Sequence, residues 1–444
     1  ADFETGGCAT LTDMYNAHPS DTGPLKITDL DGNIDESGVP TGYWLLTMDL
    51  RVHDGATLMV HGTSIGGDCD ILRIRSDGSD AFHELRAHGG SLSFRSTKVI
   101  SWDTDKGEEQ TVYEGGRSFI NCVSEVHATS AGAESDDTCD GATKNDMGEC
   151  RMDIIDSVMG NLGWFDAESY GLTWKVRGFC KDLSNPEVFD RTGVYGDIQN
   201  SEIYGMYYGM YSYGHDGGVW KENTMRDNIL YGFDPHDDSD NLEISYNKVY
   251  GNGNHGIIAS KRCNNVKIFN NEVYDGGEDA AGIFLHRSSD DAKVYNNHIH
   301  DMKDAGFAIL ESMNAEIYDN IVENVKYGIR ISLGGADNNI HDNTFDGCTS
   351  SGLYTYEGSD DPDVSDGRPS GNVYTNNIIS NTPTGVKLQD GDDNVLEGND
   401  FRGSDVFEFD DSEGIVWKGN TVDADSCYEG SVEFSSDSDT PSKC

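Results

Sequence analysis

A short asparagine motif repeats along the second half of the chain and constrains its fold more than any other feature. An Asn followed two residues later by Val, Ile, Phe or Met recurs in steps of 24, 24, 26, 23, 23, 34, 22 and 21 residues. A Gly followed by an apolar residue recurs beside it with a similar spacing. The repeated positions are Asn223, Asn247, Asn271, Asn297, Asn320, Asn343, Asn377, Asn399 and Asn420, and Gly209, Gly232, Gly256, Gly282, Gly306, Gly328, Gly352 and Gly385.

The segments between these markers alternate polar with apolar residues, and none has the 3.6-residue period of a helix. Short strands joined by Asn and Gly turns, one unit per 20 to 26 residues, predict an all-β, right-handed parallel β-helix. A leucine-rich repeat would need an L-x-x-L-x-L scaffold, and a β-propeller would need blades of about 40 residues. Asn suits the turns of a β-helix because it tolerates left-handed backbone angles and can stack its amides from coil to coil.

The repeat predicts one solenoid domain rather than the three globular domains that 444 residues would otherwise suggest. We expect a cap at residues 1–40, the β-helix at 41–425 and a C-terminal tail at 426–444. Residues 128–150 are expected to leave the coils as a disulfide-closed loop. The 34-residue step contains EGSDDPDVSDGRPSG, which we interpret as an inserted acidic loop that is solvated rather than cation-binding.

The formal charge of −49, from 31 Lys and Arg against 80 Asp and Glu, limits the partners of the chain. Because phosphates would be repelled, we expect neither a nucleic-acid partner nor an anionic membrane surface. The sequence has no run of about 18 apolar residues that could span a membrane. The N-terminus, ADFETGGC, lacks a basic and apolar leader, and we expect that a secretory leader has been removed.

Ten cysteines form an even set without a C-x-x-C pair, so zinc-ribbon and thioredoxin interpretations have no motif to support them. Disulfides fit better, and they favour a secreted protein of the extracellular space or cell wall. Cys139 and Cys150 bracket a loop of small polar residues, and Cys427 and Cys444 could fasten the C-terminal tail. The remaining pairs cannot be deduced from the sequence.

Strand alternation sorts the residues after each repeat Gly into two faces. First positions are uniformly apolar and are expected in the core: Phe233, Ile257, Ile283, Phe307, Ile329, Leu353 and Val386. Second and fourth positions are expected to point to solvent and to stack in columns about 4.8 Å apart. Second positions are Asp234, Ile258, Phe284, Ala308, Arg330, Tyr354 and Lys387, and fourth positions are His236, Ser260, His286, Leu310, Ser332, Tyr356 and Gln389.

The outward columns gather cations, imidazoles and phenols on one strip of the predicted solenoid. In a chain of charge −49, such a local gathering suits a long anionic ligand with sugar rings, such as an acidic polysaccharide. Pro235 interrupts a strand where it removes a ladder donor, which is typical of special sites. We expect the substrate to be bound by Lys175, Tyr211, Tyr213, Arg262, His286, Arg287 and Arg330.

Two linked motifs on this strip resemble a known enzyme family. YGFDPHDDSD, residues 231–240, is similar to the Y-G-F-D-P-H signature of mannuronan C-5-epimerases, and NHGIIASKR, residues 254–262, resembles the next coil of their β-helix. The resemblance is strongest from about 171 to 335. It implies conversion of D-mannuronate to L-guluronate within alginate. The disulfide-rich, single-module form looks more like the brown-algal members, because the calcium-binding nonapeptide repeats of some bacterial members are absent.

The resemblance implies a role for each matching residue. His236 matches the family histidine that takes or delivers the C-5 proton, Tyr231 its tyrosine partner, and Asp234 the first aspartate of the motif. Alternation directs Tyr213, with His236, to the strip and leaves Tyr231 before the strand, so both tyrosines stay candidates. Either Asp234 or Asp237 could fix the tautomer of His236.

A cation must also neutralise the substrate carboxylate, since loss of the adjacent proton builds up a second negative charge. Lys261 falls where one bacterial branch of the family has such an arginine, and Arg262 is next to it. Lys175 is a candidate for an upstream family lysine by its coil position. A base on one ring face and an acid on the other would then invert C-5, each contributing about 10²–10⁴-fold in rate.

Other functions stay open at this point. The same intermediate could expel the C-4 oxygen, which is the alginate lyase reaction, or the β-helix could bind polysaccharide without catalysis. Pectate-lyase-like calcium chemistry would need more carboxylates on the strip than the sequence offers. We therefore expect no required cofactor and no catalytic metal, although calcium could bind the acidic loop. The expected partner is polymannuronate, and the expected oligomeric state is a monomer.

Overall fold

The computed structural model describes most of the chain as two compact units, Ala1–Leu242 (unit 1) and Glu243–Cys444 (unit 2). The described residues are 7–18, 23–53, 55–78, 81–128, 142–143, 149–178, 189, 192–436, 438–439 and 441–444. Most of the predicted loop at 128–150, with Cys139, and also Cys180, lies outside the described residues.

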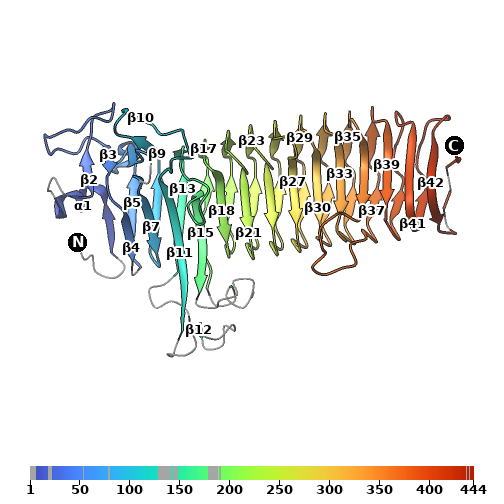
Figure 1. Ribbon diagram of the computed structural model, residues 1–444, viewed down its shortest axis with the longest axis horizontal. Helices are drawn as coiled ribbons and strands as arrows, with labels where there is room; N and C mark the ends of the chain where they lie inside the picture. The colour runs from blue at the N-terminus through green and yellow to red at the C-terminus, as the bar shows by residue number, and fades with distance from the viewer. Residues whose placement is uncertain are drawn as a thin grey trace. The chain divides into compact units, whose positions relative to one another are not determined.

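Unit 1 consists of short strands in three sheets, named here sheet 1, sheet 2 and sheet 3 (Figure 1). Sheet 1 contains β1 (Cys8–Thr10), β5 (Thr57–His61), β8 (Ser91–Arg95), β13 (Arg151–Ile155), β16 (Ile198–Gln199) and β19 (Val219–Lys221). Sheet 2 contains β2 (Leu25–Ile27), β3 (Tyr43–Leu46), β6 (Ile71–Arg75), β9 (Lys98–Asp103), β14 (Val158–Gly160), β17 (Glu202–Tyr204) and β20 (Thr224–Arg226). Sheet 3 contains β4 (Leu50–His53), β7 (Glu84–His88), β11 (Phe119–Ala128), β15 (Gly171–Gly178), β18 (Tyr208–Tyr213) and β21 (Phe233–His236).

Nearly all of these strands pair in parallel, and the antiparallel pairs are peripheral. They are β2 with β3, β10 (Glu108–Glu109) with β9, and β12 (Ala142–Thr143) with β11. The expected cap at 1–40 contains α1 (Leu11–Ala17), whose first turn is closed by a capping box between Thr10 and Asp13, and also β1, which pairs in parallel with β5. A 3-10 turn, η1 (Thr63–Ile65), follows β5.

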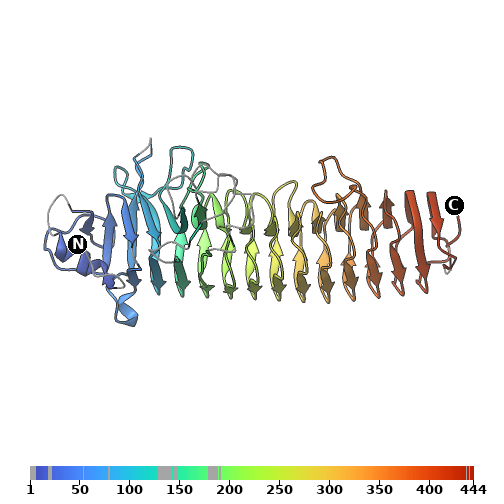
Figure 2. The same cartoon turned by 90° about the horizontal axis from the view of Figure 1, so that it is seen from below.

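Unit 2 has the same three-sheet arrangement, and Figure 2 shows its strands stacked side by side from yellow to red. Sheet 1 contains β22 (Glu243–Ser245), β25 (Lys267–Phe269), β28 (Lys293–Tyr295), β31 (Glu316–Tyr318), β34 (Asn339–His341), β37 (Val373–Thr375) and β40 (Val395–Glu397). Sheet 2 contains β23 (Lys248–Tyr250), β26 (Glu272–Tyr274), β29 (His298–His300), β32 (Ile321–Glu323), β35 (Thr344–Asp346) and β38 (Ile378–Ser380). Sheet 3 contains β24 (Ile257–Ser260), β27 (Ala281–His286), β30 (Ala305–Leu310), β33 (Tyr327–Ser332), β36 (Ser351–Tyr356) and β39 (Thr384–Gln389).

The chain visits sheets 1, 2 and 3 in turn and pairs each strand in parallel with the strand one coil later, which defines a parallel β-helix. At the end of unit 2, β41 (Val406–Lys418) pairs with both β39 and β40. The segment that we expected as a C-terminal tail from residue 426 begins with β42 (Cys427–Phe434), which pairs in parallel with β41.

The repeat Gly is required by close packing between coils. A Cβ atom on Gly282 would lie 2.4 Å from the Ile299 side chain and 3.0 Å from the Gly306 carbonyl oxygen, so no larger residue fits. The residue after each repeat Gly is buried, with at most 1% of its surface exposed, which confirms the predicted core positions Phe233, Ile257, Ile283, Phe307, Ile329, Leu353 and Val386.

The repeat Asn forms a buried hydrogen-bonded ladder in unit 2. Asn297 donates from Nδ2 to Asn320 Oδ1 at 3.0 Å and to the Ile268 carbonyl oxygen at 2.9 Å, and the pattern recurs coil by coil. The predicted amide stacking is therefore confirmed. The members are Asn247, Asn271, Asn297, Asn320, Asn343, Asn377, Asn399 and Asn420.

The second role that we assigned to the repeat Asn is wrong, because the left-handed backbone angle belongs to the residue before it. Asn270, Asn296 and Asp319 have φ angles of 54°, 54° and 54°. The sharp turn is thus made by an exposed or half-buried Asn or Asp, and the next Asn turns inward to bond the neighbouring coils.

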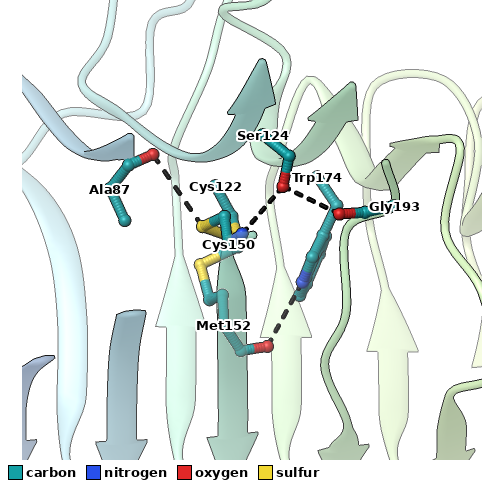
Figure 3. The surroundings of a disulfide bond; sticks show 7 residues. All are labelled: Ala87, Cys122, Ser124, Cys150, Met152, Trp174 and Gly193. Carbon is teal, nitrogen blue, oxygen red and sulfur yellow. Dashed lines mark hydrogen bonds between the residues drawn. A yellow bond between two sulfur atoms is a disulfide. The ribbon is translucent and has the colours of Figure 1, made fainter. Parts of the chain in front are cut away.

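Two disulfides lie in the described part of the chain. Cys427 and Cys444 are bonded, as predicted. Cys150, however, pairs with Cys122 of β11 rather than closing the short loop from Cys139. The Cys150 backbone nitrogen donates to Ser124 Oγ at 2.7 Å, so the end of the excursion is anchored on β11 (Figure 3). Cys122 lies opposite Trp174 in β15, and this places the bond inside the core.

Within the described residues, no helix combines the length and apolar character that a membrane crossing requires.

We expect loss of a ladder amide to destabilise unit 2. Asn338, in a second ladder, is fully buried, donates to Asn372 Oδ1 at 2.9 Å and Ser312 O at 3.2 Å, and accepts from Ala315 N. Asn338→Ala removes the side-chain bonds to Ser312 O and Ala315 N, while Asn372 Oδ1 keeps the Asn338 backbone nitrogen as a donor, and it should lower the free energy of unfolding by about 2 to 4 kcal/mol. Urea unfolding measures the change.

The adjacent residue provides the control. Asn339 is exposed on β34, and Asn339→Ala should change the unfolding free energy by no more than about 0.5 kcal/mol. Equal effects of the two substitutions would contradict a stabilising role for the ladder.

Candidate functional site

Two columns of side chains cross β15, β18 and β21 in sheet 3 of unit 1. Lys175 lies opposite Tyr213, and Tyr213 lies opposite His236. Two residues earlier, Tyr211 lies opposite Asp234. This is the order along the strip that the sequence predicted, because the two-residue period of a strand and the coil spacing together fix which residues align.

His236 is held by the corner that follows β21. Its Nδ1 contacts Asp237 Oδ2 in a short hydrogen bond, and its carbonyl oxygen accepts from Ser239 Oγ at 2.8 Å. The Asp237 carbonyl oxygen accepts from Gly214 N at 2.8 Å, which fixes the corner to the preceding coil. A carboxylate on Nδ1 favours the tautomer with its proton there, and this leaves Nε2 to exchange protons with a substrate. Of the two aspartates considered for this contact, Asp237 makes it.

Asp234 is buried beside His236, with 2% of its surface exposed and no hydrogen-bond partner for Oδ1. Burial is the main cause that raises the pKa of its carboxyl group to about 7; His236 opposes the rise, and the negative charge of Asp237 adds to it. Asp234 therefore carries a proton over much of the acid range and can donate a hydrogen bond to a bound anion.

A group of tyrosines surrounds Asp234, and several were missed by the sequence analysis. The Tyr211 ring lies 5.5 Å from the His236 ring and 5.2 Å from that of Tyr170. Tyr208 stacks on Tyr170 at 4.5 Å and contacts Tyr231 at 5.1 Å. The run YYGMYSY, residues 207–213, could have indicated these tyrosines. Its first two residues precede the repeat Gly209, and only residues after each repeat Gly were sorted into faces.

Burial sets the protonation of these phenols. It raises the pKa values of Tyr208, Tyr211 and Tyr231, and the charge of Asp234 contributes in each case. Each phenol consequently stays protonated at neutral pH and can act as a proton donor. Tyr213 is less accessible to a substrate than these three tyrosines, because only 7% of its surface is exposed.

Lys175 is a partly buried cation next to the same columns. Its Nζ lies 5.3 Å from the Tyr213 ring centre and 3.0 Å from Glu168 Oε1, and Glu168 also pairs with Arg177. Burial lowers the pKa of Lys175, and the charge of Asp237 partly offsets this. Glu168 was not predicted, because it lies in the irregular segment before the repeats become regular.

The other predicted site residues lie in unit 2, where sheet 3 again ends in left-handed corners. Lys261, Arg262 and Arg287 have φ angles of 60°, 61° and 49°. His286 Nδ1 lies 2.8 Å from Ser260 Oγ, and Arg330 pairs with Asp304 at 3.2 Å. Unit 2 therefore presents Lys261, Arg262 and Arg287 at successive corners, whereas Arg330 lies within β33.

The acidic insertion is largely exposed, in agreement with our interpretation of it as a solvated loop, but it also contacts one of these corners. Arg287 pairs with Asp363 at 2.7 Å and with the fully buried Glu311 at 3.3 Å. Glu311 in turn accepts from the backbone nitrogens of Asp363 and Val364. The loop stands out from the strands in Figure 2. An open hollow of about 740 Å³ is lined by Lys261, Arg287, Ser359, Asp360, Asp361 and Asp363.

The expectation that second and fourth positions point to solvent is wrong for many coils. Ile258, Phe284, Ala308, Ser260 and Ser332 are buried along with Asp234. Large neighbours cover one another: the Phe284 ring lies 4.9 Å from the ring of His255 and 5.1 Å from that of His286. Fewer side chains of each column are consequently exposed than the alternation pattern predicted.

The unit 1 arrangement has the parts of a proton-transfer site. It offers an oriented imidazole, protonated phenols, a carboxyl group that titrates near neutrality and a lysine, all on neighbouring strands. Perturbed pKa values beside an oriented histidine are typical of such sites. Among the described residues, none of these side chains belongs to a group of three metal-ligating residues.

The chain is similar to several known proteins. A family model described as "Right handed beta helix region" matches residues 188–367. Mannuronan C5-epimerase of Pseudomonas putida is 36% identical over 318 residues, covering 70% of this chain and 54% of that protein. Mannuronan C5-epimerase AlgG of Azotobacter vinelandii is 31% identical over 294 residues, covering 65% and 49%.

A crystal structure of the periplasmic alginate epimerase AlgG matches with a TM-score of 0.61 at 20% identity, covering 96% of this chain and 83% of that chain. With the family match, this confirms the right-handed parallel β-helix. The chain spans about half the length of the two relatives it matches in sequence.

The raised pKa of Asp234 gives a testable pH dependence of stability. Because its pKa rises from 3.8 to about 7 on folding, the folded chain binds this proton more tightly than the unfolded chain. That stabilisation is present below pH about 4 and is lost as the pH rises through 7. Between pH 4 and 8, Asp234→Asn should therefore gain at most about 4 kcal/mol in unfolding free energy relative to the unsubstituted chain.

Urea unfolding at pH 4 and pH 8 measures this difference, with Asp166→Asn, an exposed aspartate of unit 1, as the control. The same pH dependence in both variants would show that Asp234 is not protonated by burial.

Proposed function

We propose that the chain is a mannuronan C5-epimerase that converts β-D-mannuronate to α-L-guluronate residues within alginate. The observation that carries the proposal is the oriented His236–Asp237 pair beside Asp234 and the tyrosines, in a chain 36% identical to a protein of that name. The left-handed corner supports it further, because it presents the histidine at the edge of sheet 3.

The reaction needs three elements at one sugar residue. The C-5 proton lies next to a carboxylate, so its removal creates an enolate-like species with extra negative charge. That charge must be stabilised while a base on one face of the ring takes the proton and an acid on the other face returns one. All three are supplied by side chains, and we propose that the enzyme needs no bound cofactor.

We assign the base to His236, since Asp237 holds Nδ1 and leaves Nε2 for the substrate. Tyr231 is assigned as the acid, because burial keeps its phenol protonated and it is more exposed than Tyr213. Protonated Asp234 then donates a hydrogen bond to the substrate carboxylate as charge develops.

Cations complete the neutralisation of the carboxylate. Lys175 is assigned to this role in unit 1, where it lies in the same column as His236. In unit 2, Lys261 and Arg262 are assigned to other sugar carboxylates of the polymer, together with Arg287 on the following corner, His286 at the end of β27 and Arg330 within β33. Tyr211 is proposed to contact a sugar ring, whereas the buried Tyr213 ring packs against Lys175 and helps to position it.

The biological setting that we propose follows from the substrate. Alginate lies outside the cytoplasm, and the disulfides also favour an oxidising compartment. We propose a secreted, monomeric enzyme of the extracellular space or cell wall, of the brown-algal type.

Incubation with polymannuronate tests the reaction. Proton NMR should show guluronate signals that increase with time, with no rise in absorbance at about 232 nm, the absorbance of the unsaturated sugar that β-elimination would form. Unsaturation without guluronate would make the chain a lyase, and binding without either product would make it a non-catalytic polysaccharide-binding β-helix. Activity should persist in a chelator of divalent cations.

Replacing the proposed base tests the site. His236→Gln should lower kcat by about 10²-fold or more, because general base catalysis typically contributes that much. His83→Gln is the matched control, since His83 also contacts an aspartate through Nδ1, at 3.2 Å from Asp49 Oδ1. Full turnover in His236→Gln would exclude it as the base.

The two candidate tyrosines can be separated in the same assay. Tyr231→Phe should lower kcat by about 10²-fold, whereas Tyr213→Phe should lower it by less than about tenfold, since the Tyr213 ring is buried against Lys175 and Phe189. The reverse order would assign the acid to Tyr213.

A further inference from the structure

We propose that Glu272, His298 and His300 form a binding site for a divalent transition-metal ion of the Zn²⁺ class. One ligand atom from each of these side chains lies within 4.8 Å of the other two. The site is on sheet 2 of unit 2 and is unrelated to the proposed epimerase chemistry. Imidazole nitrogens with a carboxylate oxygen are ligands that favour Zn²⁺, Cu²⁺ or Ni²⁺ over Ca²⁺ and Mg²⁺.

The register of the strands brings the three side chains together. His298 and His300 are two residues apart on β29, so both project from the same face of the sheet. Glu272 on β26 lies directly opposite His298. Their side chains are 43%, 19% and 42% exposed for His298, His300 and Glu272, so an ion can reach them from solvent.

The distance between His300 Nε2 and Glu272 Oε1 is close to that between two ligand atoms of a small ion. A tetrahedral Zn²⁺ site has metal–ligand bonds of about 2.0–2.1 Å, which separates neighbouring ligand atoms by roughly 3.3–3.5 Å. His300 Nε2 lies 3.6 Å from Glu272 Oε1, and the two imidazole centres are 4.6 Å apart. Lys248 approaches the other oxygen of Glu272, Oε2, at 3.2 Å, and this leaves Oε1 directed at the imidazole.

His300 has the outer contacts of a metal ligand. Its Nδ1 lies 2.7 Å from Asp301 Oδ2, and its ring stacks on Tyr274 with centres 4.7 Å apart. A carboxylate that accepts the Nδ1 proton makes Nε2 the free, more basic nitrogen, which is the usual arrangement around ligating histidines. Asp301 is therefore a positioning residue for His300.

Glu323 on β32 supplies a further carboxylate oxygen from the coil that follows the two histidines, whereas Glu272 comes from the coil before them. Its Oε2 lies 2.7 Å from His298 Nε2, and its side chain is 42% exposed. Since Glu323 lies opposite His300 in the register, the two imidazoles are flanked by a carboxylate from each neighbouring coil. A bound ion would tie β26 to β29, and because the unfolded chain lacks this geometry it would stabilise the folded state.

Calorimetric titration of the chelator-treated chain with Zn²⁺ tests the site, in buffer with excess Mg²⁺ to occupy the surface carboxylates. We expect one saturable site, and a rise in unfolding temperature on Zn²⁺ addition. His300→Ala and His298→Ala should each weaken the affinity by about 100-fold or more, and Asp301→Asn by about tenfold.

His341→Ala is the matched control. His341 also stacks on a tyrosine, Tyr318, with its Nδ1 2.8 Å from Asp342 and its Nε2 3.7 Å from Glu316, but Asn339, two residues earlier on the same strand, takes the place of a second histidine. Its substitution should leave the affinity unchanged. Equal affinities for the unsubstituted chain, His298→Ala and His300→Ala would overturn the proposal.

A further measurement uses the unsubstituted chain, so its result does not depend on whether the variants fold. With one equivalent of Cu²⁺ in place of Zn²⁺, electron paramagnetic resonance should show coupling to two imidazole nitrogens. A spectrum with oxygen ligands alone would equally overturn the site.

Discussion

The buried asparagine ladder is the interaction on which the repeat depends. In unit 2 each amide bonds the amide one coil ahead and a backbone carbonyl one coil behind. A slip of one residue in any coil would turn that amide outward and leave buried partners unpaired on both sides, at a cost of about 1–3 kcal/mol for each group. The ladder therefore fixes the register of the unit 2 coils that it joins.

Register then determines which side chains can act together. In unit 1 the column of Lys175, Tyr213 and His236 exists only because β15, β18 and β21 are aligned residue by residue. The same alignment places Asp234 beneath Tyr211, where burial without a partner for Oδ1 destabilises its charged form. Other buried polar atoms of the described residues also lack a partner, so the missing hydrogen bond alone does not mark the site; what distinguishes Asp234 is its place between Tyr211 and the His236–Asp237 pair.

The sequence predicts the features that depend on the two-residue strand period and on the coil spacing, and few others. The core positions and the order Lys175, Tyr213, His236 follow from the two-residue strand period and the coil spacing. Features outside the repeat did not follow. The Cys122–Cys150 bond, the pairing of Glu168 with Lys175 and the packing of the acidic loop on Arg287 depend on irregular segments whose paths no period encodes. Burial of Ile258 and Phe284 depends on the size of their column neighbours, which alternation ignores.

The charge of −49 opposes the polyanion that we propose as substrate. Two of the cations that we assign to substrate carboxylates, however, are already held by protein carboxylates: Lys175 by Glu168 in unit 1, and Arg287 by Asp363 in unit 2. A substrate carboxylate that replaces one of these acids exchanges one ion pair for another, so the desolvation cost of the cation has largely been met before binding. Repulsion from acids farther away is weakened by salt beyond about 8 Å. A strongly acidic β-helix can therefore bind an acidic polysaccharide by exchanging ion pairs along its corners, without an exposed positive surface.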